Sequence, residues 1–329
     1  MWVANAWKDY EVLDCSAGEK LERWGSYTLL RPDPQVIWST ERKLPEWKKL
    51  NGHYHRSKAG GGQWEFHDLP EEWKIRYTLG TKQKDMESYT LTFHLKPFAF
   101  KHTGLFPEQA VNWDWFYPLI KKAAEAGRKP KVLNLFAYTG GATIAAAAAG
   151  AEVTHVDASK GMVGWAKENA VSSGLGEAPI RWLVDDCMKF VEREIRRGKK
   201  YDGIIMDPPS YGRGPKGELW KLEELVYELL KKSGELLSDD PLFFLINSYT
   251  TGLQPAVLSY MLHTAVLRPW QERTQGENAP AQTHGKATVN GAAGSDGGHG
   301  PSVSAEEIGL PVSHTGLVLP CGASGRIAF

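Results

Sequence analysis

The sequence is poor in cysteine, with three among its 329 residues. Cys15, Cys187 and Cys321 lie far apart and show none of the paired spacings that mark a disulfide framework or a zinc site. We therefore expect free thiols, no bound metal and a protein that works in the reducing cytoplasm.

Long apolar runs are absent as well. No stretch approaches the roughly 18 consecutive apolar residues of a membrane span. The first residues, Met1–Lys8, do not combine a basic start with an apolar segment, so we expect no signal peptide and no membrane attachment.

Neither sign of charge is in excess, because 39 basic and 39 acidic side chains give a net charge of zero. Nucleic-acid binders usually carry a local basic excess. The best candidates here are Arg193–Lys200, which Glu194 interrupts, and Arg128–Lys131. The first is more typical of a solvated helix end, so charge permits a nucleic-acid substrate without demonstrating one.

The most informative stretch is Val132–Thr143. Its apolar beginning is typical of a parallel strand buried on both faces. Gly140 and Gly141 let the backbone turn sharply and approach a ligand closely, and the alanine-rich segment 142–149 predicts a helix. The free N–H groups at the start of such a helix form a ready site for an anionic or polar ligand.

A second predicted strand, 152–157, ends in Asp157, 23 residues after Asn134. In nucleotide-binding α/β folds an acid at this place accepts hydrogen bonds from the ribose hydroxyls. The alternative is that Asp157 caps the next helix. The glycine turn shortly before it favours the ligand.

The fourth predicted strand, 201–207, runs directly into Asp207-Pro208-Pro209-Ser210-Tyr211. The two prolines fix the backbone, and Asp207 can accept a hydrogen bond from a base amino or imino group. Tyr211 can stack on a flipped base, which is worth roughly 1–3 kcal/mol. A purely structural diproline turn is the alternative.

In this order and spacing the motifs resemble class I S-adenosylmethionine-dependent methyltransferases, in particular the bacterial enzymes that methylate cytosine C5 or guanine N7 of 23S ribosomal RNA. The matching segments are Phe100–Gln109, Leu133–Gly141, Val156–Asp157, Asp185–Asp186 and Asp207–Tyr211. The resemblance covers residues 100–329. It implies S-adenosylmethionine as cofactor and a base in RNA, ribosomal RNA first, as substrate.

The resemblance also assigns site residues. Asp186 would contact the adenine amino group, with helix capping as its alternative, and Asn134 departs from the acid that many relatives carry. The predicted catalytic residues are Asp207, Pro208, Pro209 and Tyr211. The predicted cofactor-binding residues are Thr103, Phe136, Tyr138, Thr139, Gly140, Gly141, Asp157, Ala158, Asp186, Cys187 and Asp207.

Five strands that alternate with helices predict a Rossmann-like α/β fold with a parallel sheet. A terminal hairpin is expected from 316–320 and 325–329, joined by a turn at Cys321–Ser324. Residues 1–99, with seven of the thirteen tryptophans, predict a small antiparallel β domain, and 100–329 the methyltransferase domain. Residues 271–304 have no hydrophobic period and predict a disordered insertion.

Several alternatives stay open. A nicotinamide oxidoreductase needs three spaced glycines after the first strand, and only Gly140-Gly141 is present. A non-catalytic RNA-binding module, or methylation of a protein or small molecule, is also compatible with the fold. The oligomeric state cannot be predicted.

The target atom depends on cysteine, because methylation of cytosine C5 needs a thiolate that first adds to the ring. The relatives with this chemistry carry that cysteine after the fifth strand. Here 242–247 continues into Ser248-Tyr249-Thr250. We therefore predict direct transfer to a base nitrogen, with a nucleophilic Cys321 as the alternative.

Overall fold

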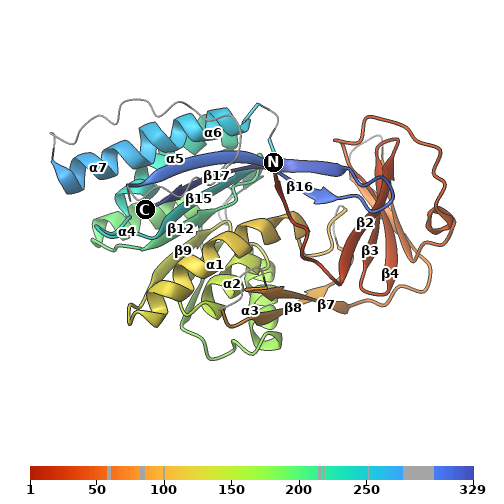
Figure 1. The fold of residues 1–329 in the computed structure, drawn as a ribbon, viewed down its shortest axis with the longest axis horizontal. Coiled ribbons are helices and arrows are strands. Elements are labelled where there is room, and N and C mark those ends of the chain that lie inside the picture. Colours follow the sequence, from red (N-terminus) through yellow and green to blue (C-terminus); the bar gives the residue numbers. More distant parts are fainter. Residues whose placement is uncertain are drawn as a thin grey trace.

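The computed structural model describes residues 1–57, 61–81, 86–98, 101–213, 217, 219–250, 252–276 and 300–329 (Figure 1). Its largest sheet has eight strands in the order β1-β16-β17-β15-β12-β9-β10-β11. These strands are β1 (Trp2–Val3), β9 (Lys131–Leu135), β10 (Glu152–Asp157), β11 (Ile180–Val184), β12 (Gly203–Met206), β15 (Phe243–Ser248), β16 (Ser302–Pro311) and β17 (Val318–Ala328).

The five strands β9, β10, β11, β12 and β15 pair in parallel. The hairpin β16–β17 extends this sheet, because β17 pairs antiparallel with β15. This arrangement confirms the predicted Rossmann-like sheet with a terminal hairpin. Strand order reverses at β9, which lies between β12 and β10, and ligands of open α/β sheets bind at such a switch point.

Helices cover both faces of the sheet, with α1, α2 and α3 on one side and α4 to α7 on the other (Figure 1). Their bounds are α1 (Ala110–Glu125), α2 (Gly141–Ala148), α3 (Lys160–Ser172), α4 (Cys187–Arg196), α5 (Leu222–Glu235), α6 (Pro255–Leu262) and α7 (Arg268–Gln275), with a π-helical segment η3 (His263–Leu267) between the last two. None of the helices in the described parts of the chain is long and apolar enough to cross a membrane.

The N-terminal region is β-rich, as predicted. A five-stranded sheet is followed by a two-stranded hairpin. The sheet consists of β2 (Tyr10–Ser16), β3 (Glu19–Trp24), β4 (Tyr27–Pro32), β5 (Gly52–Arg56) and β6 (Gly62–Phe66), the hairpin of β7 (Trp73–Leu79) and β8 (Tyr89–Leu95), and two short 3₁₀ helices are η1 (Pro45–Lys48) and η2 (Pro107–Gln109).

This region shares one apolar core with the helices α1 to α3. The Trp7 ring lies 4.6 Å from Tyr77 and 6.2 Å from Trp113 of α1. The end of the terminal hairpin also reaches the first sheet, since the Ser313 N–H donates to the Val12 carbonyl at 2.9 Å. Trp24, Trp47 and Trp73 are buried, which favours core filling over base stacking as their role.

Three expectations about local structure were wrong. Residues 271–275 complete α7 and 302–304 begin β16, so neither end of 271–304 is disordered; residues 277–299 of that segment lie outside the described residues. The hairpin turn lies at 312–317, and Cys321 is within β17. The β-branched and aromatic residues of 36–39 favour a strand, but none forms there.

The misplaced turn has a physical cause. Gly322 and Gly325 suggested a loop, but both lie in β17 where the strand packs closely against its neighbours. A Cβ at Gly322 would lie 2.7 Å from the Ser248 carbonyl oxygen, and one at Gly325 would lie 2.8 Å from a methyl of Leu262. The glycines are therefore needed for close approach.

Candidate active site

The loops after β9, β10 and β12 lie side by side, because these parallel strands are neighbours and end at the same edge of the sheet. This edge carries the glycine turn, Asp157 and Asp207. The structure therefore brings together the three motifs that the sequence singled out.

The loop after β9 has a strained backbone. Phe136 and Tyr138 have φ angles of 54° and 50°, in the left-handed region that side chains other than glycine rarely adopt. Gly140 follows at φ 82°, and a Cβ there would lie 2.8 Å from the Cβ of Ala166. Strain of this kind costs of order 1–3 kcal/mol per residue and persists only where neighbours hold it.

Side chains from the adjoining strands hold this loop. The Tyr138 N–H donates to Oδ2 of Asp157 at 2.8 Å, and the Phe136 N–H donates to the sulfur of Cys187 at 3.3 Å. The Thr139 hydroxyl donates to the Gly104 carbonyl at 2.6 Å. Sequence-distant segments thus fix the glycine turn in one shape.

Asp157 connects two loops. Its second carboxylate oxygen accepts from the Ser159 N–H at 2.8 Å, and Ser159 itself caps α3. The capping alternative for Asp157 is therefore wrong, although the carboxylate does hold backbone. Burial raises the pKa of Asp157, and the two hydrogen bonds oppose that rise. Each oxygen keeps a lone pair for a further donor.

Asp185 and Asp186 have separate contacts. Asp186 is the N-cap of α4 and accepts from the Lys189 N–H at 2.9 Å, as the alternative for this residue predicted. Asp185 forms an ion pair with Arg193. The contact of Asp186 with adenine stays a prediction. Cys187 is buried beneath the loop after β9, and burial raises the pKa of its thiol well above the usual value.

The residues around this loop fit S-adenosylmethionine. Within the described residues, three buried hydroxyl oxygens have no hydrogen-bond partner. One belongs to Ser233 of α5, and the other two, near this loop, are Oγ1 of Thr103 and the phenol oxygen of Tyr138. Both belong to the predicted cofactor site. Buried polar groups are normally satisfied, so an unpaired pair of hydroxyls is the arrangement expected where a polar ligand completes the site.

The loop after β12 is fixed by an aromatic side chain that sequence analysis missed. Trp220 donates from Nε1 to the Pro209 carbonyl at 2.6 Å, and its ring lies 5.0 Å from that of Phe136. Trp220 belongs to β14 (Leu219–Lys221), which pairs with β13 (Tyr211–Arg213). The Tyr211 side chain is 58% exposed and so is free to meet a substrate.

Gly212 and Arg213 are part of β13, although the three glycines of the sequence 212–217 favour a mobile loop. Residues 214–216 lie outside the described residues, as does the position of the Arg213 side chain. Arg213 and Lys216 are basic and lie next to the diproline loop, so we predict that they contact RNA phosphates; the described residues do not test this.

Asp207 is enclosed, with Glu108 nearby. Burial, and secondarily the Glu108 carboxylate, raise the pKa of Asp207 to about 7. Glu108 lies on η2 and is itself buried, which raises its own pKa. Sequence analysis missed Glu108 because the surrounding motif was assigned only to covering the cofactor.

An aromatic row lies next to these carboxyls. The Phe106 ring lies 5.4 Å from Tyr138 and 5.7 Å from Tyr249, which follows β15. The Tyr249 hydroxyl accepts from Nε2 of Gln109 at 2.7 Å. Flat side chains beside a diproline loop suit a planar substrate.

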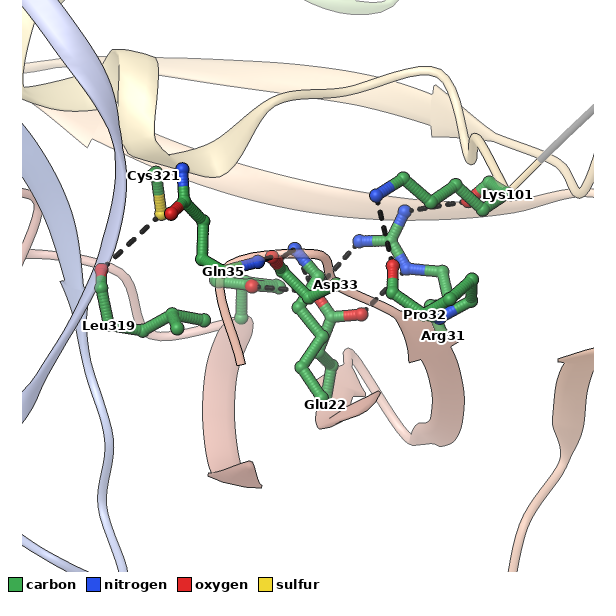
Figure 2. Close-up of polar contacts among 10 residues, drawn as sticks. Glu22, Arg31, Pro32, Asp33, Gln35, Lys101, Leu319 and Cys321 are labelled. Carbon is green, nitrogen blue, oxygen red and sulfur yellow. Dashed lines mark hydrogen bonds and ion pairs between the residues drawn. The ribbon is translucent and has the colours of Figure 1, made fainter. Parts of the chain in front are cut away.

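The N-terminal sheet contributes a polar cluster beside this edge (Figure 2). Arg31 makes two hydrogen bonds to Glu22, at 2.6 and 2.7 Å, and one to the Lys101 carbonyl at 2.9 Å. Burial alone would raise the pKa of Glu22, but Arg31 and Lys20 lower it to about 2. Burial, and then the charge of Lys20, lower the pKa of Lys101 to about 8.

Cys321 borders the same cluster, since the charges of Lys20, Asp33 and Glu22 act on its thiol (Figure 2). Its sulfur lies 3.5 Å from the Leu319 carbonyl oxygen, to which the thiol donates. Burial, followed by the charge of Glu108, raises the pKa of this thiol well above its usual value. The thiolate that a nucleophile needs is thus disfavoured.

Comparison with known proteins identifies the family of this chain. The family model of S-adenosylmethionine-dependent methyltransferases matches residues 67–255, so the chain belongs to this family. A crystal structure of an S-adenosylmethionine-dependent methyltransferase from Agrobacterium tumefaciens is 34% identical, with a TM-score of 0.79 over 98% of this chain and 90% of that one. The enzyme class is a methyltransferase, and its cofactor is S-adenosylmethionine.

More distant relatives extend the comparison. A methyltransferase crystallised with S-adenosylhomocysteine has the same fold, with a TM-score of 0.62 and 17% identity over 98% of this chain and 76% of that one. The ribosomal RNA large subunit methyltransferase K/L of Shewanella frigidimarina is 33% identical over 154 residues. That match covers 46% of this chain and 20% of the relative, so the chain spans about a fifth of the curated relative's length.

Replacing Asp157 by alanine should weaken S-adenosylmethionine binding by roughly 1–3 kcal/mol, the cost of leaving buried partners unpaired. Isothermal titration calorimetry measures this directly. Asp9→Ala, which removes a carboxylate that accepts from the Arg76 N–H at 2.9 Å outside the site, is the matched control, and thermal melting checks that both variants fold. Unchanged affinity in a folded Asp157→Ala protein would contradict the assignment.

Proposed function

We propose that this methyltransferase modifies a base in RNA, with large-subunit ribosomal RNA as substrate, by direct transfer to a nitrogen. The observation that carries the proposal is the rigid Asp207–Tyr211 loop, which places an acid and an exposed aromatic ring beside the cofactor loop. The name of the Shewanella frigidimarina relative supports RNA as substrate. An RNA substrate also fits the cytoplasmic location that three free cysteines suggest.

Each residue of the site has a proposed role. Thr103, Tyr138, Thr139 and the glycine turn hold the methionine end of the cofactor, while Asp157 and Ala158 hold its ribose. Asp186 and Cys187 lie at the adenine end. The bound cofactor supplies an electrophilic methyl group. A base nitrogen needs only to be oriented toward that methyl group, so the protein contributes mainly positioning.

The substrate side depends on the Asp207–Tyr211 loop and on the side chains that surround it. Asp207 accepts a hydrogen bond from the base, and Tyr211 stacks against its face. Pro208 and Pro209 keep the distance between them constant, and Trp220 holds the Pro209 carbonyl at 2.6 Å. Glu108, near Asp207, adds a second carboxyl to the same pocket.

The basic clusters noted in the sequence are an unfavourable surface for RNA. Arg193 is paired with Asp185, Arg197 with Glu194, and Arg128 with Asp202. RNA phosphates would have to compete with these carboxylates. Lys101 is the better candidate, because its amine donates to the Pro32 carbonyl and no carboxylate lies within ion-pair distance of it among the described residues.

Cytosine C5 methylation is the alternative that a specific observation favours. Cys321 lies near the active-site edge, since the charges of Asp207 and Cys321 both act on Tyr249. The raised pKa of the Cys321 thiol argues against a thiolate at this position. The sulfur of Cys187 already accepts a hydrogen bond from the Phe136 N–H. Protein and small-molecule substrates have no such support.

Purified protein should transfer methyl groups from labelled S-adenosylmethionine to deproteinised ribosomal RNA. Tyr211→Ala should reduce kcat at least tenfold and leave cofactor affinity within about threefold, since loss of one stacking contact costs roughly 1–3 kcal/mol. Tyr260→Ala, another exposed tyrosine, is the control. Equal activity of both variants would remove Tyr211 from the substrate site.

Methyl transfer should increase with pH through about 7, because Asp207 is neutral below its raised pKa and accepts fully only as a carboxylate. Asp207→Asn should be slow and lose this step. Burial also raises the pKa of Asp157, which is assigned to the cofactor. Measuring cofactor affinity over the same pH range therefore distinguishes titration of Asp157 from titration of Asp207. A flat profile in the wild type would contradict the role of Asp207.

Cys321→Ser should retain activity within a few-fold, because direct transfer to nitrogen needs no thiol. Cys187→Ser, which changes the support of the cofactor loop, is compared beside it. Complete loss of activity in Cys321→Ser, together with a covalent protein–RNA adduct in the wild type, would instead establish the cytosine C5 mechanism.

A further inference from the structure

Metal-type ligands gather on the N-terminal five-stranded sheet. His53 and His55 are two residues apart on β5, so their side chains are on one face. Glu65 of β6 is paired with His53 across the strands. One ligand atom from each of these three residues lies within 4.8 Å of the other two.

The spacing is close to that of a coordinated ion. Four-coordinate zinc with bonds of about 2.0–2.1 Å to nitrogen and oxygen places its ligand atoms roughly 3.4 Å apart. Nε2 of His55 now lies 2.7 Å from Oε2 of Glu65, and the His53 and His55 rings are 3.8 Å apart. Side-chain rotations that move the ligand atoms by about 1 Å, without backbone movement, would bring the three atoms to this geometry.

Surrounding groups have the character of an outer coordination shell. Glu19 lies 2.9 Å from Nε2 of His53, and Arg42 holds the other oxygen of Glu19 at 2.8 Å. A carboxylate hydrogen-bonded to the ring is the usual partner that orients a metal-bound histidine.

The site is accessible. His53 and His55, with Glu19 and Asp33, line an open hollow of about 460 Å³. The His55 and Glu65 side chains are 45% and 51% exposed. An ion can therefore enter without any rearrangement of the fold, and water can complete its coordination.

We propose that His53, His55 and Glu65 form a binding site for a divalent transition metal of the zinc class, which ties β5 to β6. Two imidazoles and one carboxylate suit such an ion, whereas magnesium and calcium prefer oxygen ligands alone. The scarcity of cysteine led us to expect no metal, but histidine and glutamate are sufficient ligands. This site is independent of the methyltransferase activity.

The test is an isothermal calorimetric titration of the full-length, chelator-treated protein with Zn²⁺. We expect about one equivalent bound with a Kd in the micromolar range, and Co²⁺ should give the visible absorption of a low-coordinate nitrogen and oxygen site. His55→Ala and Glu65→Gln should each weaken Zn²⁺ binding at least tenfold. His314→Ala, which removes another exposed histidine, should bind as the wild type does.

Melting curves without metal establish that the variants are folded, which is expected because both changed side chains are exposed. The proposal is overturned if the wild type shows no saturable Zn²⁺ binding at concentrations below about 100 µM. Above that concentration, surface histidines bind Zn²⁺ nonspecifically. It is equally overturned if either His55→Ala or Glu65→Gln keeps wild-type affinity.

Discussion

Two hydrogen bonds from the backbone of the loop after β9 are the constraint on which the site depends. The N–H groups of Phe136 and Tyr138 are held by Cys187 and Asp157, side chains that follow two other strands of the same sheet. They keep two non-glycine residues in left-handed conformations. The glycine turn thus takes its shape only when β9, β10 and β11 are paired in order.

The same logic extends to the substrate side. Trp220 connects the Asp207–Tyr211 loop to the cofactor loop, because it bonds to Pro209 and contacts Phe136. Glu108 and Tyr249 enclose Asp207 from elements on either side of the methyltransferase core. The N-terminal sheet contributes Lys20 and Arg31, whose charges act on Glu108, and Figure 2 shows Arg31 among its polar partners.

The parallel strands and most helices could be predicted, because their apolar periods and glycine stops are local signals. The predicted strand 152–157 coincides with β10, and the predicted strand 201–207 contains β12. The full length of β17 could not be predicted. Its glycines are required by close contacts with Ser248 and Leu262, and these contacts cannot be read from the sequence. Glu108 and Trp220 were missed for the same reason: their roles depend on segments distant in sequence. Asp157 and Asp207 were found because acids at strand ends have a fixed place in this fold.

The central claim is that the Asp207–Tyr211 loop directs methyl transfer to a base nitrogen in RNA. Its most direct test is mass spectrometry of modified nucleosides in ribosomal RNA from cells with and without this protein, complemented by the wild type or Asp207→Asn. We predict that one base methylated on nitrogen disappears without the protein and returns only with the wild type. Unchanged RNA modifications, or selective loss of 5-methylcytosine, would contradict the account.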